Sequence, residues 1–306
     1  MNLNSTWSAL EESYDLLGDY GYPAMDKAAE EMGLEPDFFS WLVAVWLFGA
    51  ETFTTADYMR MFPYGQAREN EEGFASAAQK GYLISDGSGR YTRSQKGMDV
   101  AQKIWRAAGD SLASLKPIPD EREQRLMEYL GRLVTASLAA PEPPSHFYLS
   151  HKYENYSRYG TKCPLEDFIV RFGSLSAFRD DIYIACWSAH GVQGHVWETL
   201  DKLSQNDVMT FDDLFDQVKR RVPTRELLAE NVMELARRGW ADDALGRIQI
   251  TAEGKQVRAE VEAETEHLFF APWTSLDESK LDELASLARQ LRDGLKKGKV
   301  DNDEQN

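Results

Sequence analysis

The chain has 306 residues, enough for two domains of ordinary size with a hydrophobic core in each. Its hydrophobic content of 42% is typical of globular proteins, and no apolar run reaches the length of a membrane span. We therefore expect a soluble cytoplasmic protein with no membrane partner. The formal net charge of −17 argues against non-specific attraction to DNA over the whole surface, because phosphate binding requires local positive charge.

The chain begins with helical patterns. Helices are predicted over residues 5–17 and 24–32, separated at Pro23, because proline interrupts a helix. A helix that begins at Asp37 is apolar around most of its circumference, which predicts that Trp41 and Trp46 are largely buried.

A compact supersecondary unit follows the apolar helix. Its predicted elements are a short helix after Thr54, a helix over 66–80, a strand over 81–84 and a hairpin return over 89–92. Two long amphipathic helices come next, over 94–115 and 120–138.

A second unit shows the same succession of signals. Thr210 is a good N-cap for a helix over 211–218, and a helix over 225–238 ends at basic residues and a glycine. The following turn and the alternation of Ile248 and Ile250 predict a β-hairpin, after which Thr251 begins another helix.

The order of helix, turn, helix, hairpin and long helix resembles the winged helix-turn-helix of MarR-like regulators, with ITAEGKQV (250–257) similar to the end of their wing. FRDDIYIACWSAHGVQGHVWETLDKL (178–203) also resembles an uncharacterised family of actinobacterial helix-turn-helix proteins. The resemblance implies that the second helix of each unit can lie in a DNA major groove, with the wing on the backbone beside it.

The two units align without a gap, which indicates an internal duplication. Gly89–Arg90 matches Gly246–Arg247, and the same offset pairs Gly97 with Gly254. The predicted fold is mainly α with small β-hairpins, as tandem duplicated winged helix-turn-helix domains with flanking helices. The predicted division is 1–140 for the N-terminal helices and first winged-helix unit, 141–160 for a Pro- and aromatic-rich linker, 161–295 for the second unit and 296–306 for a disordered tail.

These observations favour a DNA-binding transcriptional regulator whose partner is double-stranded DNA. Between 210 and 258, nine acidic residues are matched by nine basic ones, so this region is less acidic than the chain as a whole. The alternative is an acidic winged-helix module for protein interaction or ligand sensing that does not bind DNA, favoured by glutamates on both predicted recognition helices. The candidate phosphate-binding residues are Arg68, Lys80, Arg90, Arg93, Arg220, Arg221, Arg225 and Arg247.

A cluster of aromatic residues is a weaker candidate for a ligand pocket, because such clusters are more often core than ligand site. A small-molecule effector and a homodimer are left open as partners. The aromatic residues of this candidate pocket are Tyr148, Tyr153, Tyr156, Trp187 and Trp197.

No catalytic or metal site is predicted. His190 and His195 stand five residues apart, which places them on different faces of a helix, and Cys163 and Cys186 form no zinc-binding pattern. The chain lacks nucleophile-elbow and phosphate-loop motifs, and it lacks the QxQ segment of the DNA glycosylases that contain tandem winged helices. We therefore expect a protein that is not an enzyme and needs no cofactor.

Overall fold

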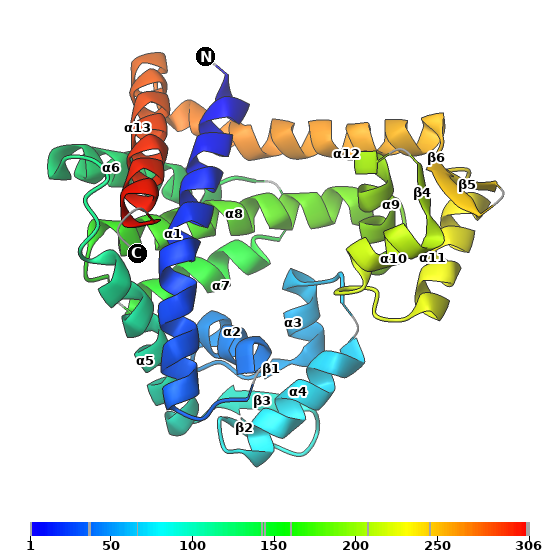
Figure 1. The fold of residues 1–306 in the computed structure, drawn as a ribbon, viewed down its shortest axis with the longest axis horizontal. Coiled ribbons are helices and arrows are strands. Elements are labelled where there is room, and N and C mark those ends of the chain that lie inside the picture. Colours follow the sequence, from blue (N-terminus) through cyan, green and yellow to red (C-terminus); the bar gives the residue numbers. More distant parts are fainter. Residues whose placement is uncertain are drawn as a thin grey trace.

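The chain is mainly helical and carries two small antiparallel sheets, so the predicted fold class is confirmed (Figure 1). This computed structural model describes residues 2–35, 38–65, 67–141, 143, 145–159, 161–206, 208–244 and 246–303. None of the described helices is both long enough and apolar enough to span a membrane.

The first part of the chain contains a small three-stranded sheet with the strand order β1-β3-β2. We call the segment from α2 to β3 the first unit. The elements are α1 (Leu3–Glu31), α2 (Phe38–Phe48), β1 (Phe53–Thr54), α3 (Thr55–Met61), α4 (Ala67–Gln79), β2 (Leu83–Ser85), β3 (Arg90–Arg93), α5 (Gln95–Leu112) and α6 (Asp120–Leu138).

The second part contains another such sheet, with the order β4-β6-β5. From α8 onward, helices and strands follow one another as they do from α1, and we call the segment from α9 to β6 the second unit. The elements are α7 (Phe147–Tyr156), η1 (Ser157–Tyr159), α8 (Pro164–Ser188), α9 (Gly194–Asn206), β4 (Val208–Thr210), α10 (Phe211–Val218), α11 (Arg225–Arg237), β5 (Ala241–Ala244), β6 (Arg247–Ile250), α12 (Ala252–Phe270), η2 (Ala271–Ser275) and α13 (Glu278–Asp303).

The helix after each hairpin begins with the same set of hydrogen bonds. At the start of α12, Thr251 Oγ1 accepts from Gly254 N at 3.0 Å and donates to Gly239 O at 2.6 Å. Ser94 makes the equivalent pair of bonds at the start of α5, at 2.9 and 2.6 Å. Each N-cap therefore starts its helix and also ties it to the glycine turn before the hairpin.

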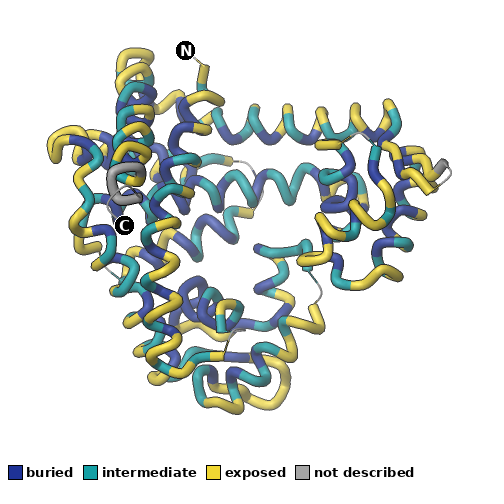
Figure 2. Tube along the Cα trace, in the orientation of Figure 1, coloured by how far each residue is buried: buried dark blue, intermediate teal, exposed yellow. Residues whose placement is uncertain are grey.

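The long helices are exchanged between the two parts of the chain. Helix α1 packs on α5 of its own part and on α13 of the other, while α8 packs on α12 and on α6 (Figure 1). The largest apolar cluster therefore contains residues of both parts, among them Leu10, Leu130, Phe172 and Leu291. Two further clusters fill the first and second units. Figure 2 shows buried residues along α2 and α8 and exposed residues at the β5–β6 tip.

Three predicted boundaries differ from the structure. Helix α1 continues through Pro23 without a break, because long-range packing on α5 and α13 outweighs the cost of a proline inside a helix. The predicted linker contains α7, which is packed against α8 and α2. The predicted disordered tail is helical from Lys296 as far as Asp303, and residues 304–306 lie outside the described residues.

Helix α7 is fixed at its first turn by a carboxylate from α8. Asp181 accepts from the backbone N–H groups of Tyr148 and Leu149 at 3.0 and 2.9 Å, which satisfies two donors that the helix itself leaves unpaired. The helix also buries Tyr148, Leu149 and Tyr156. The aromatic density of this segment thus reflects burial rather than a flexible connection.

Candidate nucleic-acid interface

Helix α11 presents two different sides. Leu228, Val232 and Leu235 are buried in the core of the second unit, whereas Glu230 and Met233 are exposed, the latter by 63%. Thr224 caps the helix by accepting from Leu227 N at 3.2 Å. The exposed side of α11 is thus available to a partner, although its middle carries a carboxylate and an apolar side chain rather than bases.

Asn231 belongs to the buried side and positions α11 on α9. Its amide donates to His195 O at 3.1 Å and to Thr199 Oγ1 at 3.0 Å, and its Oδ1 lies 2.7 Å from His195 Nδ1. Asn231 is fully buried, so these contacts replace water entirely. The residue therefore holds the helix in place rather than facing a ligand.

Replacing Asn231 by alanine is expected to lower the free energy of unfolding by about 1–3 kcal/mol, because the hydrogen bonds of this fully buried amide to His195 and Thr199 are lost. Urea unfolding followed by circular dichroism measures this loss. The exposed Gln217 on α10 provides the control, and Gln217→Ala should change stability by less than about 0.5 kcal/mol. Equal effects of the two substitutions would contradict the positioning role.

Basic residues are concentrated in the turn between α10 and α11 and at the start of α11. Lys219 pairs with Asp216 at 3.0 Å, and Arg225 pairs with Asp212 at 2.6 Å while remaining 54% exposed. Arg220 is exposed and forms no ion pair with any described residue. Of these side chains, Arg220 can turn to a phosphate without first breaking an ion pair.

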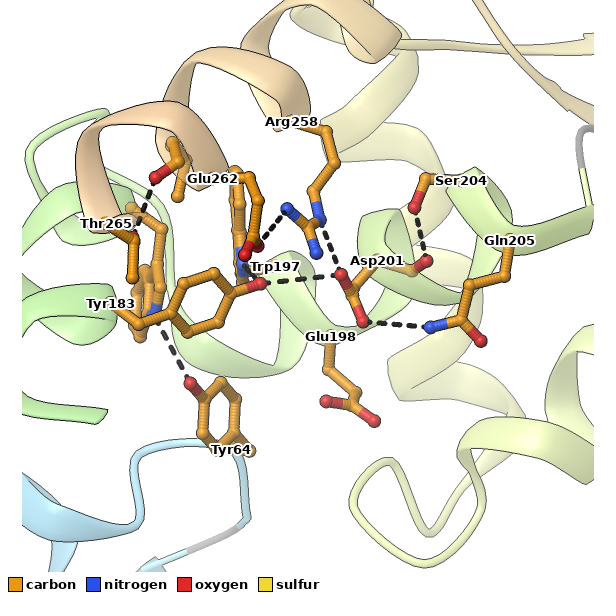
Figure 3. Close-up of polar contacts among 12 residues, drawn as sticks. Tyr64, Tyr183, Trp197, Glu198, Asp201, Ser204, Gln205, Arg258, Glu262 and Thr265 are labelled. Atoms are coloured by element: carbon orange, nitrogen blue, oxygen red, sulfur yellow. Dashed lines mark hydrogen bonds and ion pairs between the residues drawn. The ribbon is translucent and has the colours of Figure 1, made fainter. Parts of the chain in front are cut away.

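Arg221 has a different environment from its neighbour. Its guanidinium pairs with the buried Glu198 at 2.6 Å and lies 4.9 Å from the centre of the Tyr64 ring, which belongs to the first unit. The hydroxyl of Tyr64, a residue labelled in Figure 3, accepts from Trp187 Nε1 at 3.3 Å. Burial raises the pKa of Tyr64 well above its usual value, so the phenol stays protonated. Arg221 therefore belongs to the contact between the two units.

Gly194 is part of the same contact. A Cβ atom at this position would lie 2.2 Å from the carbonyl oxygen of Pro63, so only glycine allows the two backbones to come this close. This contact and Tyr64 were not predicted from the sequence. Gly194 is visible in the sequence as the second glycine of HGVQGH (190–195), but Pro63, the residue it contacts, lies more than one hundred residues earlier.

A polar network fixes α9 on the long helices (Figure 3). Arg258 of α12 contacts Asp201 at 2.6 Å and Glu262 at 2.9 Å, and Tyr183 of α8 accepts from Trp197 Nε1 at 2.8 Å. Arg258 is one of the nine basic residues between 210 and 258, but its guanidinium is paired with carboxylates of this network rather than left for a partner. The network holds the second unit in one orientation on α8 and α12.

The wing of the second unit ends in a free base. Gly246 adopts φ +75° at the tip of the hairpin, and Arg247 follows it as an exposed residue with no ion pair to any described residue. Arg237 and Arg238 near the end of α11 are instead engaged by Glu234, whose pKa their hydrogen bonds lower to about 2. Arg220 and Arg247 are thus exposed bases of this unit that form no ion pair within the described chain.

The first unit offers a less basic surface. Helix α4 exposes Glu69, Glu71 and Glu72, and its Arg68 pairs with Glu72 at 2.8 Å. The remaining predicted bases are also engaged or covered: Lys80 pairs with Glu35 at 2.7 Å, Arg90 lies 4.0 Å from Asp86, and Arg93 is half-buried.

The five aromatic residues predicted as a ligand pocket do not share one. Tyr148 and Tyr156 lie in the core of the first unit, and Trp187 and Trp197 lie in that of the second. Tyr153 is 36% exposed. Tyr156 is the one of the five that lines a cavity of about 130 Å³ beside α1. No group of three or more metal-binding side chains occurs within the described residues.

Residues 175–300 match the profile of a helix-turn-helix family, over a stretch that contains the whole second unit but less than half of the chain. The predicted helix-turn-helix resemblance of the C-terminal half is therefore confirmed, while the MarR-like resemblance stays a prediction. Helix-turn-helix domains belong in general to DNA-binding regulators. Comparisons with curated proteins and with solved structures gave no match.

Proposed function

We propose that the protein is a DNA-binding transcriptional regulator built from two copies of a winged helix-turn-helix, in which the second unit makes the principal DNA contacts. The observation that supports this most directly is that two exposed bases, Arg220 before α11 and Arg247 on the wing, form no ion pair within the described chain. Helix starts and wing tips are the places where such units meet the sugar-phosphate backbone.

The duplication is supported by the repeated order of elements and by the equivalent N-cap bonds of Ser94 and Thr251. The two copies differ in surface charge, because the exposed side of α4 is dominated by glutamates. The first unit therefore contributes less to phosphate binding. Its Lys80, Arg90 and Arg93 remain secondary candidates for contacts at the edge of the duplex.

Replacing both Arg220 and Arg247 by alanine should weaken binding to every duplex sequence. The slope of log K against log salt should become shallower by about 2, roughly one unit for each lost phosphate contact. Fluorescence anisotropy with a labelled duplex, titrated at several potassium chloride concentrations, measures both quantities. Thermal unfolding should hardly change, because neither side chain is paired within the described chain.

Arg221→Ala is the matched control, since it removes the same charge from the adjacent position. It should instead destabilise the protein, because Glu198 loses its partner while buried and Tyr64 loses a cation above its ring. If wild-type protein retains no duplex even at low salt, where electrostatic attraction is greatest, the regulator function is wrong.

The second candidate function is an acidic interaction module that does not bind DNA. It is favoured by Glu69, Glu71 and Glu72 on α4, whose carboxylates would face phosphates if α4 entered a groove. A protein partner with a basic surface would be attracted to the same side of α4. Absence of duplex binding at low salt is the result that would favour this candidate.

A further inference from the structure

A cleft of about 520 Å³ lies between the two units, beside the contact of Gly194 with Pro63. One wall comes from α3 of the first unit, and the others come from the start of α7, the last two turns of α8 and the segment that leads into α9. Its volume is within the range of small-molecule sites in proteins. A molecule bound here would contact both parts of the chain.

The lining of the cleft is apolar where it is covered and polar where it is exposed. The exposed lining residues are Arg60, Ser145, Ser188 and Gln193. The buried and half-buried apolar residues include Pro143, Phe147, Ile184, Trp187 and Val192. A molecule that matches both parts has an apolar body and a polar head at the edge of the cleft.

Arg60 is the base among the described residues of the lining. Its guanidinium carbon lies 3.6 Å from the centre of the Phe147 ring, and Nη2 donates to Ser145 Oγ at 3.3 Å. Phe147 and Ser145 both line the cleft, so the guanidinium lies at its edge. Arg60 is exposed and forms no ion pair with any described residue. The stacked guanidinium is therefore held in place with N–H donors left for an anionic acceptor.

Asp181 is the carboxylate among the described lining residues, and it differs from Arg60 in being buried. Its two oxygens accept from Tyr148 N and Leu149 N at the start of α7, where the end of the helix stabilises a negative charge. Burial raises the pKa of Asp181 to about 7, so the group is only partly ionised at neutral pH. The charge that solvent and a ligand can reach is therefore that of Arg60.

The aromatic rings of the lining offer little free surface. Phe147 has Arg60 against it and the ring of His151 with its centroid 4.3 Å away, and Trp187 is 3% exposed. The half-buried side chains of Ile184 and Ala185 are aliphatic. The covered part of the cleft thus suits an aliphatic body better than a stacked aromatic ring.

We propose that this cleft binds an aliphatic monocarboxylate, of the kind of a medium-chain fatty acid, with the carboxylate on the guanidinium of Arg60 and the chain against the apolar lining. A guanidinium can hold a carboxylate through two parallel N–H bonds, which a neutral head group cannot reproduce. The proposal does not depend on whether the protein binds DNA.

Four probes test the head group and the chain separately. Octanoate, 1-octanol, octylammonium and butanoate are each titrated into the full chain by isothermal titration calorimetry in the absence of DNA. Octanoate should bind about 3- to 10-fold more tightly than 1-octanol, through the charged hydrogen bonds to Arg60. It should bind at least about 10-fold more tightly than butanoate, because each buried methylene contributes up to about 4-fold. Octylammonium should bind less tightly than octanoate.

Arg60→Gln should remove the preference for octanoate over 1-octanol and retain the binding of 1-octanol. Arg106→Gln is the matched control, because it removes the same charge from an exposed residue of α5 that does not line the cleft. It should preserve the preference.

Two further measurements locate the bound chain. Ala185→Leu fills part of the space and should weaken octanoate and 1-octanol alike, with thermal unfolding as the check that this variant is folded. In the wild type, nuclear Overhauser effects should connect the octanoate chain with the methyl groups of Ile184 or Ala185. The second measurement needs no variant.

Four results would overturn the proposal. The first is equal affinity of the wild type for octanoate and 1-octanol, or no binding of either. The second is loss of the preference in Arg106→Gln as well as in Arg60→Gln, which would assign it to net charge. The third is tighter binding of octylammonium, which would make Asp181 the determining charge. The fourth is octanoate binding without contacts to Ile184 or Ala185. None of these results bears on Arg220 or Arg247, so failure here leaves the DNA proposal standing.

Discussion

Replacing Trp41 by alanine is expected to lower the free energy of unfolding by about 3–5 kcal/mol, the range for truncating a large aromatic side chain in a core. Trp41 is 4% exposed and stacks on Tyr82 with ring centroids 4.5 Å apart and planes at 3°. The substitution therefore leaves a cavity between α2 and the start of the first hairpin. Guanidinium unfolding followed by far-ultraviolet circular dichroism measures the loss.

Phe39→Ala is the control for Trp41, because Phe39 lies on the same helix but is 46% exposed. Removing the Phe39 ring leaves no buried cavity of comparable size, so Phe39→Ala should lower stability clearly less than Trp41→Ala does. Equal losses for the two variants would mean that burial on α2 does not determine the cost.

The second large effect is expected at Gly254 in the first turn of α12. A Cβ atom there would lie 2.2 Å from Trp240 O, and the backbone cannot give way as a flexible side chain could. Gly254→Ala should therefore destabilise by about 1–3 kcal/mol, as overpacking does, even though alanine is the better helix former. Thermal unfolding and a urea titration together measure this loss.

The equivalent position in the first unit should behave in the same way. A Cβ atom on Gly97 would lie 2.1 Å from Tyr82 O, so Gly97→Ala should cost a similar amount. Gly73→Ala in α4 is the control, because its nearest neighbour would be Ser40 Oγ at 3.4 Å. That variant should be neutral or slightly stabilising. A stable Gly97→Ala protein would speak against equivalent construction of the two units.

Local signals in the sequence predicted the second unit well. Thr210 caps α10, Thr224 caps α11 and Thr251 caps α12, each by accepting from a backbone N–H three residues later. These interactions lie within one turn of a helix, so the residue type and its spacing are sufficient to predict them. The burial of Trp41 and Trp46 was predicted from a local pattern as well, because the residues of α2 are apolar around most of the circumference of the helix.

Contacts between distant residues were not predictable in this way. Arg220 and Arg221 are adjacent residues of the same type, so the sequence does not distinguish them. In the structure, Arg221 contacts Glu198 and Tyr64, whereas Arg220 forms no ion pair within the described chain. Likewise, Pro23 predicted a helix break, but α1 continues through it because the helix packs along both α5 and α13. In both cases the deciding partner lies in another part of the chain, and a single sequence does not reveal which segments meet.

The exchange of long helices has a consequence for the order in which the protein can fold during synthesis. Helix α1 leaves the ribosome well before α13, one of its two main partners, because most of the described chain lies between them. Helix α6 also packs on α13 and is likewise synthesised before it. The apolar sides of α1 and α6 therefore remain uncovered while the rest is translated, and such surfaces favour aggregation. Co-translational chaperones that shield apolar helices should accordingly matter more for this chain than for one whose halves close independently.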